Sequence, residues 1–214
     1  KDIYDLSVGT YGVSITDNLG CVYPYSFSIT EPDSIIYLSL NSIDYSSYGV
    51  SCFGFNDGLV GVDALGGVGG FSYQWKANSV IIEGQVADTI SNLFANNYQV
   101  LVTDQNGCQM SDTIIITEPD PLSFDTIIFA PDTCELEKGS ASVEIAGGVP
   151  LYDYFWVDYK MDTISDLSLI DSLTEGVYTI LINDLNDCFI NSNVKIGNLL
   201  SPIANFTTNP SHKK

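Results

Sequence analysis

Cysteine is the residue type whose spacing in this sequence most clearly indicates chemistry. One motif occurs three times and ends on cysteine each time: YGVSITDNLGC at Cys21, YQVLVTDQNGC at Cys108 and YTILINDLNDC at Cys188. Two further cysteines, Cys52 and Cys134, precede the second and third copies. The chemistry open to these thiols is disulfide formation, which is typical of secreted proteins rather than cytosolic ones.

The repeat suggests how the cysteines pair. Each complete repeat holds one early and one late cysteine, so we predict the disulfides Cys52–Cys108 and Cys134–Cys188, with Cys21 left over. Each bridge would stabilise its module by about 4 kcal/mol in the chain-entropy model. In a standard β-sandwich, however, the loop that joins the first two strands lies at the opposite end from this hairpin turn. Links between modules and free thiols therefore remain open as alternatives.

Acidic and amide side chains in the turns offer a second kind of chemistry, cation binding. Asp104 and Asn106 lie just before Cys108, and Asp57 lies in an Asn-Asp-Gly sequence. Oxygen ligands at such spacing suit calcium, so these three residues are weak candidates for a metal site. The same residue types also suit a tight hairpin turn. Because the ligand ladder and terminal Glu of an EF-hand are absent, we favour the turn and expect no cofactor.

No constellation of residues points to catalysis. His212 is the only histidine and lies in the tail, so no Cys-His or Ser-His pair can form within a folded module. The sequence has neither a phosphate-binding loop nor zinc-ligand spacing. Nothing singles out a catalytic pair among the 27 Asp and Glu residues. We therefore predict that the protein is not an enzyme.

The charge balance limits the partners. Seven Lys and Arg residues against 27 Asp and Glu residues give a formal net charge of −20, which disfavours nucleic acid and anionic membranes. No run of apolar residues is long enough to span a bilayer, so we expect no direct membrane insertion. The start KDIYDL lacks the pattern of a signal peptide, and the first repeat begins in its middle, so the sequence reads as an excised segment.

Short strands must position these residues. About seven apolar or alternating segments, separated by turns, are expected in the second repeat, among them 35–40, 58–64, 71–75, 79–82, 88–93 and 112–119. The third repeat follows the same plan. This pattern is typical of an antiparallel sandwich, so the predicted fold class is all-β, with tandem immunoglobulin-like or fibronectin-like β-sandwiches.

Two aromatic positions recur in the repeats. GGVGGFSYQW and GGVPLYDYFW place Trp75 and Trp156 at equivalent positions, where a tryptophan in a sandwich strand is a core residue. Tyr11, Tyr98 and Tyr178 each follow a leucine and a Gly or Asn in the same pattern. This pattern resembles the tyrosine corner of such sandwiches, whose hydroxyl bonds to backbone upstream.

The repeat spacing predicts the domain organisation. Copies that begin about 80 to 87 residues apart indicate an array of small domains. We expect residues 1–32 to be the C-terminal part of a truncated module, 33–119 and 120–200 to be complete sandwich modules, and 201–214 to be a linker or the start of another domain.

The repeat also resembles a known family. The features that carry this likeness are CFGFNDG at 52–58, Tyr73 and Trp75 after the glycines, the strand and turn of 98–108, and the close ITEP at 116–119, which also stands at 29–32. Together they are similar to the SprB-type repeat of giant cell-surface adhesins in gliding Bacteroidota. The third module departs from the pattern, with CELEKG and IGNL in place of the loop and the close. The tail PIANFTTNP resembles the start of a PKD-like domain.

The resemblance implies a long secreted filament that the type 9 secretion system exports and that moves along the cell surface during gliding. Our first hypothesis is that the modules form a structural stalk segment of such an adhesin. Their expected partners are neighbouring modules of the same chain, and polysaccharide or other surface proteins. The alternative is that the modules themselves bind carbohydrate or cations. Aromatic candidates for such a surface are Phe53, Phe55, Tyr45 and Tyr48, although packing between modules also explains them.

A second sequence pattern is independent of the fold. Asp, then Ser or Thr, then an aliphatic residue occurs more often than composition predicts, and it resembles the O-glycan acceptor motif of Bacteroidota surface proteins. Alternatively, such triplets merely begin strands. The six candidate acceptors are Ser34, Thr89, Thr113, Thr126, Thr163 and Ser172.

Overall fold

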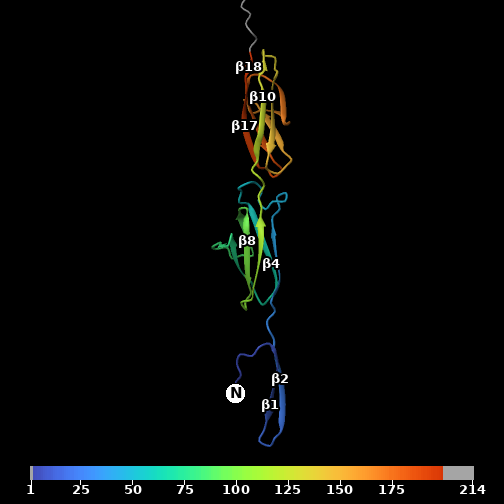
Figure 1. Ribbon diagram of the computed structural model, residues 1–214, viewed down its shortest axis with the longest axis vertical. Coiled ribbons are helices and arrows are strands. Elements are labelled where there is room, and N and C mark those ends of the chain that lie inside the picture. The colour runs from blue at the N-terminus through green and yellow to red at the C-terminus, as the bar shows by residue number, and fades with distance from the viewer. Residues whose placement is uncertain (1, 200–214) are drawn as a thin grey trace, which may run out of the picture. The chain divides into compact units, whose positions relative to one another are not determined.

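The computed structural model of the chain describes residues 2–199, and every regular element in that range is a strand (Figure 1). The predicted fold class, all-β with immunoglobulin-like antiparallel sandwiches, is confirmed. The segment expected to open a PKD-like domain, 201–214, lies outside the described residues. Within residues 2–199 no helix is long and apolar enough to cross a membrane.

The described chain forms two compact units. The first contains the chain up to Asn41 together with Val60–Ile90 and Asn97–Ile114. The second contains Ser42–Leu59, Ser91–Asn96 and the chain from Ile115 onward. The boundary therefore cuts across strands of the second repeat. The loop that carries Cys52 belongs to the same unit as the whole third repeat.

Most strands of the second repeat lie in the first unit, in two antiparallel layers. The three-stranded sheet has the order β3-β4-β7, made by β3 (Ile35–Ser42), β4 (Gly58–Gly66) and β7 (Thr89–Leu93). The four-stranded sheet has the order β6-β5-β8-β9, made by β6 (Val80–Ile81), β5 (Ser72–Ala77), β8 (Asn96–Thr103) and β9 (Gln109–Ile116). This is the two-sheet arrangement of an immunoglobulin-like sandwich.

Alternating side chains fill the space between these sheets. Along β8, Tyr98, Val100 and Val102 are buried while their neighbours are not, as a strand with one core face requires. Trp75 on β5 is fully buried, and its indole Nε1 donates to the carbonyl oxygen of Ala87 at 2.9 Å. The prediction that Trp75 is a core residue is confirmed.

The second unit repeats this plan. Its three-stranded sheet has the order β10-β12-β15, made by β10 (Ser123–Ala130), β12 (Gly139–Ala146) and β15 (Leu169–Leu173). Its four-stranded sheet has the order β14-β13-β16-β17, made by β14 (Thr163–Ser165), β13 (Asp153–Val157), β16 (Gly176–Asn183) and β17 (Phe189–Ile196). A short parallel pair joins β11 (Asp132–Thr133) to β18 (Asn198–Leu199).

The core of the second unit is centred on Trp156. This side chain is fully buried, and its Nε1 donates to the carbonyl oxygen of Leu167 at 3.0 Å, which matches the bond of Trp75. The prediction for Trp156 is therefore also confirmed. Around it pack Ala141, Val143, Ile170, Leu173, Ile180, Ile182, Val194 and Ile196.

The first unit also holds a hairpin of β1 (Gly9–Thr16) and β2 (Val22–Ile29), which carries the first copy of the repeated motif. Its tyrosine hydroxyl behaves as predicted, because Tyr11 donates to the carbonyl oxygen of Ser7 at 2.6 Å. Tyr178 likewise donates to the carbonyl oxygen of Thr174 at 3.2 Å. The tyrosine corner is thus confirmed at these two positions, and Tyr98 is buried at the third.

Candidate functional site: a disulfide clasp between repeats

The turn that precedes each late cysteine is built around one aspartate. In the third repeat, Oδ1 of Asp184 accepts the backbone N–H of Asn186 and that of Cys188, both at 2.9 Å. The equivalent oxygen in the second repeat, Oδ1 of Asp104, accepts from Asn106 at 2.9 Å and Cys108 at 2.8 Å. These bonds fix the backbone of the asparagine and of the cysteine in each turn, and so define where their side chains start. The preferred interpretation of these residues as turn formers is confirmed.

The second carboxylate oxygen ties each turn to the Gly-Gly-Val corner of its own repeat. Oδ2 of Asp184 accepts the N–H of Val149 at 2.8 Å, and Oδ2 of Asp104 accepts that of Val68 at 3.0 Å. Glycine is required at this approach, since Gly148 has φ +61° and a Cβ there would lie 2.7 Å from the Asp184 carboxylate. The recurring glycines therefore serve the turn as well as the corner.

Hydrogen bonding stabilises the ionised form of Asp104. The backbone N–H of Val68, and then those of Cys108 and Asn106, lower the pKa of this carboxyl below its ordinary value, while burial opposes them. Asp104 is accordingly a buried carboxylate whose charge is satisfied mainly by backbone donors, with the Cys108 thiol as a further donor. Its acceptor positions face the chain rather than an open cavity.

The three candidate metal ligands are not gathered into one cluster. Asp104 and Asn106 lie in the β8–β9 turn, whereas Oδ1 of Asp57 accepts the N–H of Ser51 at 3.0 Å and thereby shapes the loop before β4. Among residues 2–199, no group of three or more His, Cys, Asp or Glu side chains is placed to hold a metal ion. Calcium binding thus stays a hypothesis without a described site.

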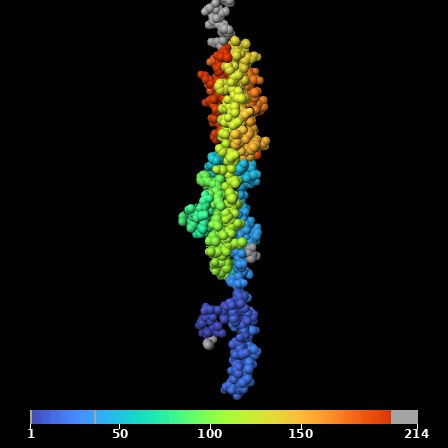
Figure 2. All heavy atoms as spheres, viewed as in Figure 1, coloured from blue at the N-terminus to red at the C-terminus, as the bar shows by residue number. Residues whose placement is uncertain are grey.

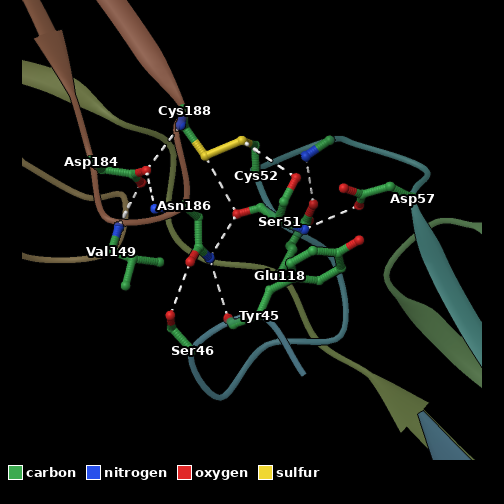
Figure 3. The surroundings of a disulfide bond; sticks show 11 residues. Tyr45, Ser46, Ser51, Cys52, Asp57, Glu118, Val149, Asp184, Asn186 and Cys188 are labelled. Carbon is green, nitrogen blue, oxygen red and sulfur yellow. Dashed lines mark hydrogen bonds between the residues drawn. A yellow bond between two sulfur atoms is a disulfide. The ribbon is translucent and has the colours of Figure 1, made fainter. Parts of the chain in front are cut away.

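The disulfide joins Cys52 to Cys188, with an S–S length of 2.03 Å and a Cα–Cα distance of 5.7 Å (Figure 3). The predicted pairings Cys52–Cys108 and Cys134–Cys188 are therefore wrong, and the alternative of a link between repeats is what the structure shows. Cys21 and Cys108 carry free thiols. Both bonded cysteines lie in the second compact unit, although they come from successive repeats.

The third repeat shows why a bridge within one repeat fails. Cys134 lies before the start of β12 at Gly139, whereas the turn of Cys188 is bonded to Val149, beyond the end of β12 at Ala146. An eight-residue strand is about 26 Å long, and a disulfide needs Cα atoms within about 7 Å. The early and late cysteines of one sandwich therefore lie at opposite ends of it.

Asn186 makes the contact more than a single covalent bond. Its Oδ1 accepts the hydroxyl of Ser46 at 2.9 Å, and its Nδ2 donates to the carbonyl oxygens of Tyr45 at 3.2 Å and Ser51 at 3.1 Å (Figure 3). One amide side chain thus satisfies three groups of the loop that carries Cys52. We call this disulfide together with the three Asn186 bonds the clasp.

The loop of residues 42–59 is held in the shape that the clasp requires. The N–H of Gly49 donates to the carbonyl oxygen of Thr117 at 3.0 Å, and that of Gly54 donates to the Glu118 carboxylate at 2.7 Å. Figure 2 shows this loop on the surface beside the chain of residues 115–122. Gly49 is itself required, because a Cβ there would lie 2.8 Å from Cγ2 of Ile116.

An apolar groove runs beside the disulfide. Phe53 and Phe55 are each 53% exposed, and they line it together with Pro121, Leu122, Phe189 and Ile190. The other two aromatic candidates, Tyr45 and Tyr48, are half-buried and pair with each other through their backbones. The structure therefore places Phe53 and Phe55, but not the tyrosines, at an open surface.

The six acceptor candidates are mostly accessible. Five of them are exposed, and Thr126 is half-buried. Ser34, Thr89 and Thr163 lie at or just before the first residue of a strand, as the strand-start interpretation expects, whereas Thr113, Thr126 and Ser172 lie inside strands. Strand initiation thus accounts for half of the triplets, and glycosylation stays a prediction.

One part of the chain is similar to a known protein family. Residues 49–80 match the family model described as SprB repeat, a range that includes Cys52 and the Trp75 strand. None of the curated proteins compared with the chain matches it.

Solved structures give a likeness of fold alone. The N-terminal eight Ig domains of Down Syndrome Cell Adhesion Molecule are 12% identical, with a TM-score of 0.43, 89% of this chain covered and 28% of that one. Extracellular domains 3–5 of Drosophila OTK are 14% identical, with a TM-score of 0.39, 90% of this chain covered and 71% of that one. The chain thus spans just over a quarter of the first of these structures. The family match thus covers residues 49–80, and this part of the chain is similar to an SprB repeat.

Proposed function

We propose that this chain is a spacer segment of a cell-surface adhesin, in which successive repeats are fastened to each other by clasps. The observation that carries the proposal is the Cys52–Cys188 bond, whose sequence separation of 136 residues joins one repeat to the next. A covalent tie between repeats serves transmission of force along a chain. A module that binds its ligand alone does not require a tie to its neighbour.

Energetics support the same role. In the chain-entropy model a closed loop of 136 residues stabilises the folded state by about 5 kcal/mol. That is as large as the whole stability of many small domains. Each of the three Asn186 hydrogen bonds joins a group of the loop to a side chain of the next repeat. A hydrogen bond of this kind adds about 0.5 to 1.5 kcal/mol to the stability of the folded state.

Secretion and gliding belong to the same proposal. Through its resemblance to the adhesins of gliding Bacteroidota, the chain is proposed to be exported by the type 9 secretion system and to extend from the cell surface during gliding. The neighbouring repeats are its first partners, and a net charge of −20 keeps exposed repeats soluble. We propose no catalytic role.

The second candidate is adhesion by the modules themselves, and one observation favours it. Phe53 and Phe55 line an open groove, and aromatic faces of this kind stack on sugars. A glycan and polysaccharide array probed with the chain and with a Phe53→Ala/Phe55→Ala variant separates the two functions. The spacer proposal expects no specific binding by either protein. Specific binding that is lost in the double variant would show that the modules act as adhesion units and would contradict the spacer proposal.

A further inference from the structure

We propose that the turn Asp104–Cys108 is a second clasp half: a docking site for a cysteine-bearing loop of the Cys52 type from another repeat. This inference rests on the proposed function, since it extends one observed clasp to the next position of the array. The partner is defined by its chemistry. It is a loop with the backbone form of residues 44–57, carrying a cysteine and a serine where Cys52 and Ser46 stand.

The first support is that the two turns have the same internal bonds. The aspartate N–H donates to the cysteine carbonyl oxygen at 3.0 Å in both, and the residue before the cysteine donates back to the aspartate carbonyl oxygen at 3.1 Å in both. The residue after the aspartate donates to the corner valine carbonyl oxygen at 3.0 Å in the turn of Cys108 and 3.1 Å in that of Cys188. The turn of Cys108 is therefore already in the form that binds a loop elsewhere in this molecule.

The second support is that the two groups which make the clasp are present and are more exposed than their counterparts in the closed clasp. Asn106 occupies the position of Asn186, and Cys108 occupies that of Cys188. Asn186 is half-buried and Cys188 is buried under the bound loop, whereas Asn106 is exposed and Cys108 is half-buried with a free thiol. The same set of groups is thus occupied in one repeat and open in the other.

The turn of Cys21 provides a control within the same chain. Its aspartate Asp17 makes the two matching bonds, to Leu19 and Cys21 at 2.9 Å, but the clasp position holds Leu19 instead of asparagine. Leu19 is 85% exposed and offers no hydrogen bond to a loop. Cys21 is also the more exposed thiol, so unselective reagents should prefer it to Cys108.

The test is thiol–disulfide exchange with a synthetic peptide of residues 44–57, whose cysteine is supplied as a mixed disulfide with thionitrobenzoate. The Cys108 thiolate attacks the peptide sulfur, its proton goes to solvent, and thionitrobenzoate leaves with the electrons of the broken S–S bond. Peptide mapping of the intact chain then reports which cysteine carries the peptide. The control reagent is glutathione as a mixed disulfide with thionitrobenzoate, which reports the intrinsic reactivity of each thiol in the absence of the loop sequence.

We expect the peptide to favour Cys108 over Cys21 by about tenfold relative to glutathione, the equivalent of roughly one or two clasp hydrogen bonds. Asn106→Ala should abolish that preference, and Leu19→Asn should increase peptide exchange at Cys21. Equal peptide and glutathione preferences, with neither variant changing them, would overturn the inference. That outcome leaves the Cys52–Cys188 bond, and the spacer proposal that it carries, unaffected.

Discussion

The clasp should hide most of two repeats from a stretching force. The Cys52–Cys188 bond encloses every strand from β4 to β16, so tension applied at the chain ends bypasses them once the clasp is closed. At about 3.3 to 3.6 Å per extended residue, the sequence separation of 136 between the cysteines corresponds to about 450–490 Å of hidden length. We expect the oxidised chain to reach a final contour length shorter by this amount than the reduced chain.

Optical-tweezer extension with handles at both termini measures this difference directly. The chain is pulled with and without a reductant, and a Cys188→Ser variant should show the full length in both conditions. Cys108→Ser is the matched control, because it removes a thiol outside the clasp and should leave the hidden length unchanged. A bridge within the second repeat, Cys52–Cys108, would hide only about 56 residues, or about 185–200 Å. That shorter step, or none, would refute the clasp.

Two further changes test the aspartate-centred turns of the second and third repeats, both read by urea denaturation and tryptophan fluorescence. Asp104→Asn should destabilise the first unit at neutral pH and flatten its loss of stability in acid. Because hydrogen bonds lower the pKa of Asp104, its contribution is complete above about pH 4 and disappears as the pH falls through the lowered value; an unchanged acid profile would argue against this role. Gly148→Ala should cost about 2–3 kcal/mol, because its Cβ would meet the turn aspartate 2.7 Å away at φ +61°. Gly84→Ala, at φ +78° with nothing within 4 Å, should cost only about 1 kcal/mol; equal costs would mean that the close approach does not matter.

Local sequence was enough to predict the sheets and their cores. The alternation before Cys108, the two tryptophans and the aspartate-centred turns depend on contacts within a strand or a hairpin, and those contacts recur in each repeat. Strand ends were less predictable. The strand expected at 79–82 is reduced to Val80–Ile81, because Asn78 and Ser79 both take positive φ in the turn before it.

Cysteine pairing could not be derived in the same way. The repeat pattern places two cysteines in each complete repeat, which suggests a bridge within the repeat. Which sulfur atoms actually meet depends on the end of the sandwich at which each cysteine lies. The role of Asn186 was missed because asparagine is common in turns for reasons of backbone conformation alone, so its presence there did not point to a further contact. One signal was present in the sequence: asparagine occupies this position at 106 and 186, but leucine occupies it at 19.

The most direct measurement is peptide mapping of the oxidised, unreduced chain by mass spectrometry. Our account predicts one disulfide-linked species that joins the peptide of Cys52 to that of Cys188, with Cys108 alkylated as a free thiol. A Cys52–Cys108 species in its place would contradict the link between repeats and, with it, the spacer that we propose.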